Sequence, residues 1–126
     1  MRRFLLILVL LLSLSNCESD DAQSNDLAGS WNLMSFQCCL FESEVFDQGD
    51  IIWTFNTDNT LDVIVNITLI ENSQVPIQEN STVSYSLTSN TVLLQSVEYD
   101  YFFEEGQLYL TDDPEVDGSI IIFERR

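Results

Sequence analysis

Apolar residues recur at every second position along much of the chain from Leu27 onward, and no stretch there shows the apolar period of a helix. A period of two is that of a strand with one buried and one solvated face. The clearest run of buried-face positions is Leu61, Val63, Val65, Ile67 and Leu69. Runs rich in Val, Ile, Thr, Phe and Tyr predict strands at 29–37, 50–57, 60–70, 81–88, 91–97, 99–104, 107–111 and 119–125.

The residues between these strands favour tight connections. Asp58-Asn59, Ser89-Asn90, Glu105-Gly106 and the loop from Asp112 to Gly118 all carry turn-forming residues. Sequential strands joined mostly by hairpins form a meander, and closing the meander removes its unpaired edges. We therefore expect an all-β domain, an eight-stranded antiparallel up-and-down barrel, with an open sandwich as the alternative.

The first residues differ from the rest of the chain. Arg2 and Arg3 precede an apolar run of eleven residues, Phe4 to Leu14, which is shorter than the roughly 20 residues that span a bilayer. This order is typical of a secretory signal peptide. Leu14-Ser15-Asn16-Cys17 resembles the cleavage box of bacterial lipoproteins, which implies that Cys17 is acylated and anchors the mature chain in the membrane. An ordinary signal peptide with an incidental cysteine is the alternative.

The segment after Cys17 is polar and acidic, and its composition predicts a disordered tether. The chain is thus divided into a signal peptide (1–16), a tether (17–26) and one barrel domain (27–126). Acids directly after the lipidated cysteine resemble the surface-export signal of Bacteroidetes lipoproteins, although a solvated linker explains them equally. The implied location is the bacterial outer membrane, on its periplasmic or cell-surface side.

Charge narrows the range of functions. The chain has 4 Lys and Arg against 21 Asp and Glu, a formal net charge of -17, and no His. Every acid follows Cys17, so the mature chain keeps all of them. Arg2 and Arg3 are lost with the signal peptide, which leaves Arg125 and Arg126 as the cations of the mature chain. Such a surface repels phosphate backbones, which excludes nucleic acid as a partner. Because the commonest general base and the amine nucleophile are both missing, we expect no enzyme and no cofactor.

The start of the domain carries a family resemblance. Leu27-Ala28-Gly29-Ser30-Trp31 resembles the Gly-x-Trp opening of lipocalins, and especially of small lipocalin-like domains in bacterial lipoproteins. Later segments are similar in the same order: Trp53-Thr54-Phe55-Asn56, Tyr85 to Leu94, and Leu108 to Arg125. The resemblance implies that Trp31 closes the base of the barrel. Arg125, or else Arg126, would cover Trp31 with a cation–π contact of about 1 kcal/mol.

The resemblance also implies a binding function, for a small apolar or amphiphilic ligand at the cell envelope. The ligand should be neutral or cationic, because the chain has no Lys or His to pair with a buried carboxylate. Alternation points six side chains to the interior, and these are the candidate pocket: Trp53, Phe55, Val63, Val65, Tyr85 and Tyr101.

The alternative function is a structural or interaction lipoprotein with a filled barrel and no ligand. The loop from Cys39 to Gly49 is the longest clear insertion among the predicted strands, and it mixes four large apolar residues with three acids. This composition suits a lid or a docking surface for a protein partner. An interior cavity would favour the ligand, and a barrel packed to its axis would favour the partner.

Two further motifs resemble sites of metal binding or redox chemistry. Cys38-Cys39 could form a disulfide, a soft-metal site or two packed thiols, and we favour packing or a disulfide because zinc needs more soft ligands. Residues 113–118, followed by Glu124, nearly fit a calcium-binding loop, but the flanking residues predict strands where such a loop needs helices. We expect an acidic hairpin there and no metal site.

Overall fold

The structure is a computed structural model that describes residues 25–39, 42–112 and 118–126. In these ranges it contains nine strands, joined by turns and loops. The strands are β1 (Gly29–Gln37), β2 (Glu44–Val45), β3 (Ile51–Phe55), β4 (Thr60–Val65), β5 (Ser81–Leu87), β6 (Thr91–Leu94), β7 (Val97–Glu104), β8 (Gln107–Asp112) and β9 (Ser119–Arg125). None of the described residues forms a helix long and apolar enough to cross a membrane.

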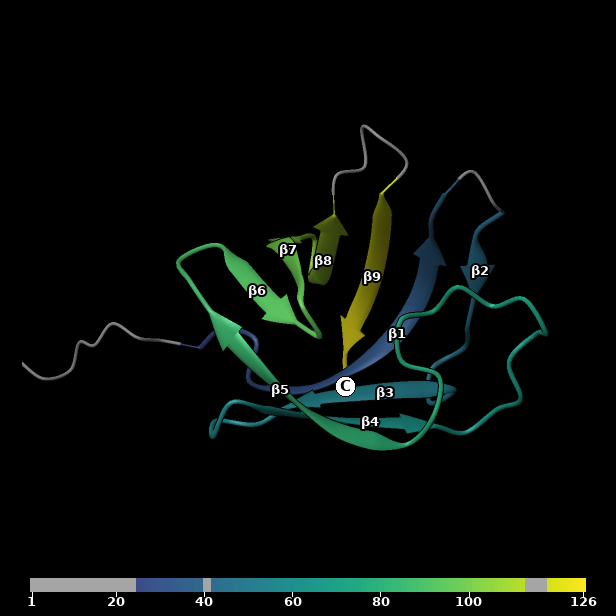
Figure 1. Cartoon of the computed structure of the whole chain (residues 1–126), viewed down its shortest axis with the longest axis horizontal. Helices are drawn as coiled ribbons and strands as arrows, with labels where there is room; N and C mark the ends of the chain where they lie inside the picture. Colours follow the sequence, from purple (N-terminus) through teal and green to yellow (C-terminus); the bar gives the residue numbers. More distant parts are fainter. Residues whose placement is uncertain (1–24, 40–41, 113–117) are drawn as a thin grey trace, which may run out of the picture.

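All neighbouring strands are antiparallel, and the pairing of β1 with β9 closes the sheet into a barrel. Eight strands form its wall, and the short β2 pairs with β1 beside them. β1 is shared between two crossing halves of the wall, because residues 29–32 pair with β3 and residues 31–37 with β9. β5 divides in the same way between β4 and β6 (Figure 1). The predicted eight-stranded up-and-down barrel is confirmed, and the open sandwich is excluded.

The barrel has two unlike ends. At the end that we call the base, residues 25–28 lie against the start of β1 and the end of β9, where Trp31 pairs with Arg125. At the other end, the rim, β1 ends at Gln37 opposite Ile120, and the connections 38–50 and 66–80 begin. Figure 1 shows both connections on the same side, around β2.

A β-bulge in β1 explains which of its residues face inward. The register with β9 shifts between Leu33 and Ser35, so the buried positions change from Trp31 and Leu33 to Phe36. An extra residue in one strand moves every later side chain to the other face. Without this bulge, Phe36 would point to solvent.

The third predicted strand is shorter than expected. The sequence alternates through Leu69, but β4 ends at Val65 because β3 begins opposite it at Ile51 and β5 begins at Ser81. The connection 66–80 is therefore longer than the loop from Cys39 to Gly49, which also contains β2. The prediction that this loop is the longest insertion is wrong.

The interior is filled by the barrel's own side chains. Trp53 lies between Phe55 and Phe123, with ring centroids 6.1 and 5.0 Å away, and Phe55 meets the ring of Tyr85 edge-on at 5.1 Å. The long connection 66–80 adds Val75 and Ile77, both buried in this core. Burial of each large apolar side chain stabilises the fold by about 1.5–3 kcal/mol.

Candidate functional site

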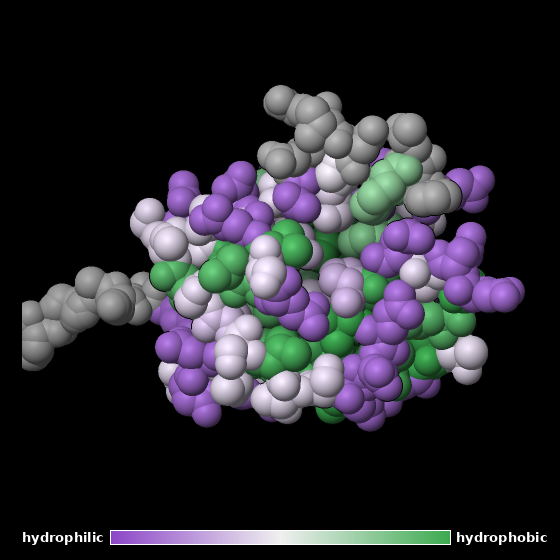
Figure 2. Space-filling view, in the orientation of Figure 1, coloured by the Kyte–Doolittle hydropathy of each residue, from purple (hydrophilic) through white to green (hydrophobic). Residues whose placement is uncertain are grey.

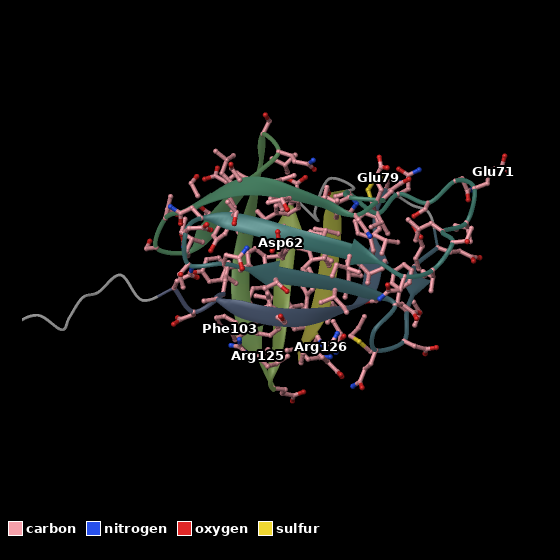
Figure 3. All side chains as sticks on the ribbon, turned by 90° about the horizontal axis from the view of Figure 1, so that it is seen from below. Asp62, Glu71, Glu79, Phe103, Arg125 and Arg126 are labelled. Carbon is pink, nitrogen blue, oxygen red and sulfur yellow. A yellow bond between two sulfur atoms is a disulfide. The ribbon has the colours of Figure 1, made fainter. Side chains whose placement is uncertain are left out.

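The base is closed by a contact between Trp31 and Arg125. The guanidinium carbon of Arg125 lies 4.0 Å from the centroid of the Trp31 ring, so the predicted contact is present. Arg125 also donates a hydrogen bond to the carbonyl of Ala28 (2.9 Å), and the indole N–H of Trp31 donates to the carbonyl of Leu27 (2.9 Å). Phe103 stacks on Trp31 at 6.0 Å, and Figure 3 shows it beside the two arginines. These contacts tie residues 25–28 across the end of the barrel.

Gly29 makes room for this arrangement. Its φ of +121° is a conformation that L side chains rarely adopt, and a Cβ there would lie 2.7 Å from Nη1 of Arg125. The glycine of the Gly-x-Trp motif therefore lets Arg125 pass close to the backbone and reach the Trp31 ring. Sequence reasoning identified Trp31 and Arg125 but gave no role to Gly29.

The candidate pocket residues lie inside the barrel. Trp53, Phe55, Val63 and Tyr85 are each at most 4% exposed, and Val65 and Tyr101 are partly buried against the same core. They pack against one another and against neighbouring core residues, as the Trp53, Phe55 and Tyr85 rings show. Of the six, Tyr85 lines a recess of about 410 Å³ together with residues that include Val83 and Leu93.

The Tyr85 hydroxyl and the Trp53 indole N–H, two polar groups within this core, differ in their hydrogen bonding. The hydroxyl of Tyr85 donates to the carbonyl of Asn56 (2.7 Å) and accepts from the Asn25 side chain (2.8 Å). Asn25, which the sequence places in the tether, is thus bonded to the barrel. The indole N–H of Trp53 is buried and has no hydrogen-bond acceptor among the described residues. A buried donor without an acceptor is uncommon in folded proteins.

Two neighbouring recesses lie at the rim, and Glu44 and Ile70 line both of them. A recess of about 250 Å³ is lined by Phe36, Cys38, Glu42, Glu44, Ile70, Asn72 and Gln74. A second recess, of about 330 Å³, lies between residues 43–46 and residues 67–70, with Asp50 beside them. Figure 2 shows hydrophobic surface broken by polar atoms at this end.

Glu44 holds the rim together. Its carboxylate accepts a hydrogen bond from the Ser73 hydroxyl (2.8 Å) and another from the Gln74 backbone N–H (2.9 Å). β2 is thereby attached to the connection 66–80. The Gln78 side chain donates to the carbonyls of Ser73 (2.9 Å) and Val75 (3.1 Å), which fixes the turn that buries Val75.

Charge is distributed unevenly between the two ends. Glu42, Glu44 and Asp50 line the rim recesses, and Glu71 projects from the tip of the connection 66–80 (Figure 3). The cations of the described chain are Arg125 and Arg126 at the base. The rim therefore presents negative charge without a basic side chain of its own.

An outer polar cluster links β4 and β5. Asp62 accepts hydrogen bonds from the Thr82 hydroxyl (2.7 Å) and the Asn56 amide (3.1 Å), which hold the pKa of its carboxyl below the usual value. Inside the barrel, burial, with a smaller contribution from Asp112, raises the pKa of Tyr99 to about 12. The hydrogen bonds of Asp62 thus join the turn at Asn56 and β5 to β4.

The remaining candidate chemistry is limited. Cys38 and Cys39 are joined as a disulfide at the end of β1, in agreement with one of the two favoured readings, and Cys38 lines the smaller recess. Within the described ranges, no three His, Cys, Asp or Glu side chains are grouped so that they could hold a metal ion. Residues 113–117 of the calcium-like segment and Cys17 lie outside the described residues.

Comparisons with known proteins assign no family. A scan against protein-family models finds no match to the chain, and a search of curated proteins finds none either. The likeness to lipocalins therefore stays a prediction made from the Gly-x-Trp opening and the order of the hairpins.

Sequence reasoning missed most of the rim. It noted the apolar and acidic mixture that includes Val45, but it did not single out Phe36, Glu44 or Ile70. The odd spacing from Leu33 to Phe36 was a signal for the bulge that turns Phe36 inward. No local pattern indicated that Glu44 binds residues about thirty positions away.

Proposed function

We propose that this chain is a non-enzymatic binding module of the bacterial envelope that holds a protein partner at the rim of a filled barrel. The observation that carries the proposal is the packing of the candidate pocket residues against one another, with Trp53 at its centre. A filled interior leaves the outer surface for recognition. The exposed apolar residues Val45 and Ile70 at the rim supply that surface.

A lipid anchor on Cys17 is compatible with partner binding at the rim. The described chain enters the barrel at the base, through residues 25–28. The few residues between Cys17 and Asn25 can span at most about 3.5 Å each. A lipid on Cys17 would thus hold the base within roughly 30 Å of the membrane and leave the rim free to face away from it.

The rim's composition defines the partner. Its carboxylates disfavour acidic surfaces, and its exposed valine and isoleucine favour apolar contact. A partner that presents apolar and cationic side chains together satisfies both requirements.

Site-specific photo-crosslinking in the native envelope tests the proposal. A photoreactive residue at Val45, exposed on the rim, should give a defined adduct with one protein. The same residue at Thr57, exposed at the base, is the control and should not give that adduct. Equal adducts at both positions, or none at Val45, would contradict partner binding at the rim.

A small amphiphilic ligand inside the barrel is the second candidate function. The unpartnered N–H of Trp53 favours it, because a ligand oxygen could accept that hydrogen bond. The core around Trp53 would have to open for the ligand to enter. Retention of a neutral or cationic small molecule during gentle purification, lost in Trp53→Phe, would support this candidate over the first.

A further inference from the structure

Residues 67–70 have the character of a strand without a partner. They follow β4 directly, and Ile67 and Leu69 are half-buried while Thr68 and Ile70 are exposed, which is the period of a strand. Within the described part of the chain, none of their four backbone N–H groups donates to a protein acceptor. Only the carbonyl of Ile70 accepts a backbone hydrogen bond, from Ser73 (3.1 Å). The segment thus offers unpaired backbone donors and acceptors to a neighbouring strand.

A second unpaired edge lies opposite. β2 pairs with β1 on one side and stands at the end of the sheet order, so its other side has no neighbouring strand among the described residues. The 330 Å³ recess is lined by β2 and its flanking residues on one side and by residues 67–70 on the other. Two segments with unpaired edges therefore line one shared recess.

The side chains around this hollow are suited to an extended peptide. Val45 and Ile70 are 76% and 60% exposed, more than any other large apolar side chain in the described ranges. Glu44 and Asp50 line the same recess, and Glu42 lines the adjoining one. Successive side chains of an added strand point to opposite faces, so an alternating sequence can meet the apolar and the acidic groups separately.

Natural sheets usually block such edges with charges, prolines or bulges. Here the free segment is Ile67-Thr68-Leu69-Ile70, in which β-branched residues predominate and no charge or proline interrupts. An open edge of this composition is a template for another strand.

We propose that residues 67–70 and β2 bind an extended segment of a protein partner by β-strand addition, and that this segment alternates apolar residues with Lys or Arg. The backbone hydrogen bonds supply affinity, and the apolar and acidic side chains of the rim supply selectivity. This inference rests on the proposed function and specifies how the partner is held.

Peptide binding to the full chain in detergent tests the mode of recognition. The probe is a short capped peptide that alternates Val with Lys and Thr, and its analogue is N-methylated on alternate residues of one edge. The peptide should bind and protect the amides of residues 67–70 from hydrogen exchange. The analogue keeps every side chain but loses backbone donors, so its affinity should fall by about tenfold or more.

Two proline variants provide the matched comparison. Thr68→Pro removes a backbone N–H that has no partner among the described residues and should weaken peptide binding by about tenfold or more. Thr57→Pro, at the first central position of the base turn in which Asn59 N–H bonds to the Asn56 carbonyl, should leave binding unchanged. Tryptophan fluorescence of each variant verifies its fold.

Failure of this inference can be told apart from failure of the proposed function. No peptide binding, equal binding of the N-methylated analogue, or protection that spares both residues 67–70 and β2 would overturn strand addition. The crosslink at Val45 does not depend on the peptide. An adduct there together with any of these results would keep the rim as a partner site but reject strand addition.

Discussion

Gly29 is the residue at which the closure of the base is most easily tested. Gly29→Ala combines an unfavourable φ with a close approach to Arg125, and should lower the free energy of unfolding by about 1–3 kcal/mol. Urea denaturation measures the change. Gly106→Ala is the control, because Gly106 also has a positive φ but open space around its Cβ, so only the conformational part of the cost remains. Equal costs at the two positions would mean that Arg125 does not need the space.

Ionisation of Tyr99 should lower the free energy of unfolding at alkaline pH. Its pKa rises from 10.0 to about 12 because burial and the nearby Asp112 disfavour the phenolate. The neutral phenol binds its proton more tightly in the folded state, so the associated stability is complete below pH 10 and is lost as the pH rises towards 12. Tyr99→Phe should therefore lose less stability between about pH 9 and about pH 11.5, by urea denaturation. Equal losses in both chains would contradict this assignment.

Several residues could be assigned from the sequence and others could not, for physical reasons. Trp53, Phe55 and Val63 belong to regular alternating runs, so their inward direction follows from the strand period, whereas Trp31 was assigned from the lipocalin resemblance. Val75 and Ile77 flank Pro76 in a polar connection, and only the tertiary fold shows that they enter the core.

At the scale of elements, local pattern located the strands, and their partners fixed where they end. Residues 60–70 alternate throughout, yet β4 stops at Val65 because the ladders to β3 and β5 stop there. β2 was missed because two residues carry no periodic signal. The turn at Gln95-Ser96 was missed because it lacks the glycine or asparagine that marks such turns.

The same turn gives a prediction about hairpin chemistry. Gln95 and Ser96 both have positive φ, 53° and 70°, in a two-residue turn between β6 and β7. Replacing them by Asn and Gly should stabilise the fold by about 1 kcal/mol, because these residues reach that conformation at lower cost. Thermal unfolding monitored by circular dichroism measures the gain. An unchanged or lower melting temperature would show that the turn is not strained.

At the scale of the whole molecule, the proposal of partner binding at the rim depends on a barrel interior that is filled by side chains. Val63 lies opposite Trp53 on the inner face and is 2% exposed, whereas its neighbour Ile64 points outward and is 42% exposed. Val63→Phe should overpack the interior and destabilise the fold by about 1–3 kcal/mol. Ile64→Phe, on the same strand, should have little effect. If Val63→Phe were tolerated as well as Ile64→Phe, the barrel would have unfilled space at its centre.

The two ends of the barrel differ in composition and in the roles that we propose for them. The base carries the cations and the aromatic closure, on the side where the tether enters. The rim carries the exposed Val45 and Ile70 and the two recesses, which Glu42, Glu44 and Asp50 line. The proposed lipid anchor and the proposed partner site would thus lie at opposite ends of the barrel.

Native mass spectrometry of the chain released gently from its own membrane distinguishes a protein partner at the rim from a ligand inside the barrel. We expect an acylated mature chain that carries a protein partner and no small molecule. The complex should be lost when Val45 and Ile70 are both replaced by Ser. A small molecule retained in stoichiometric amount, with no protein partner, would contradict the account and indicate that the barrel itself is the binding site.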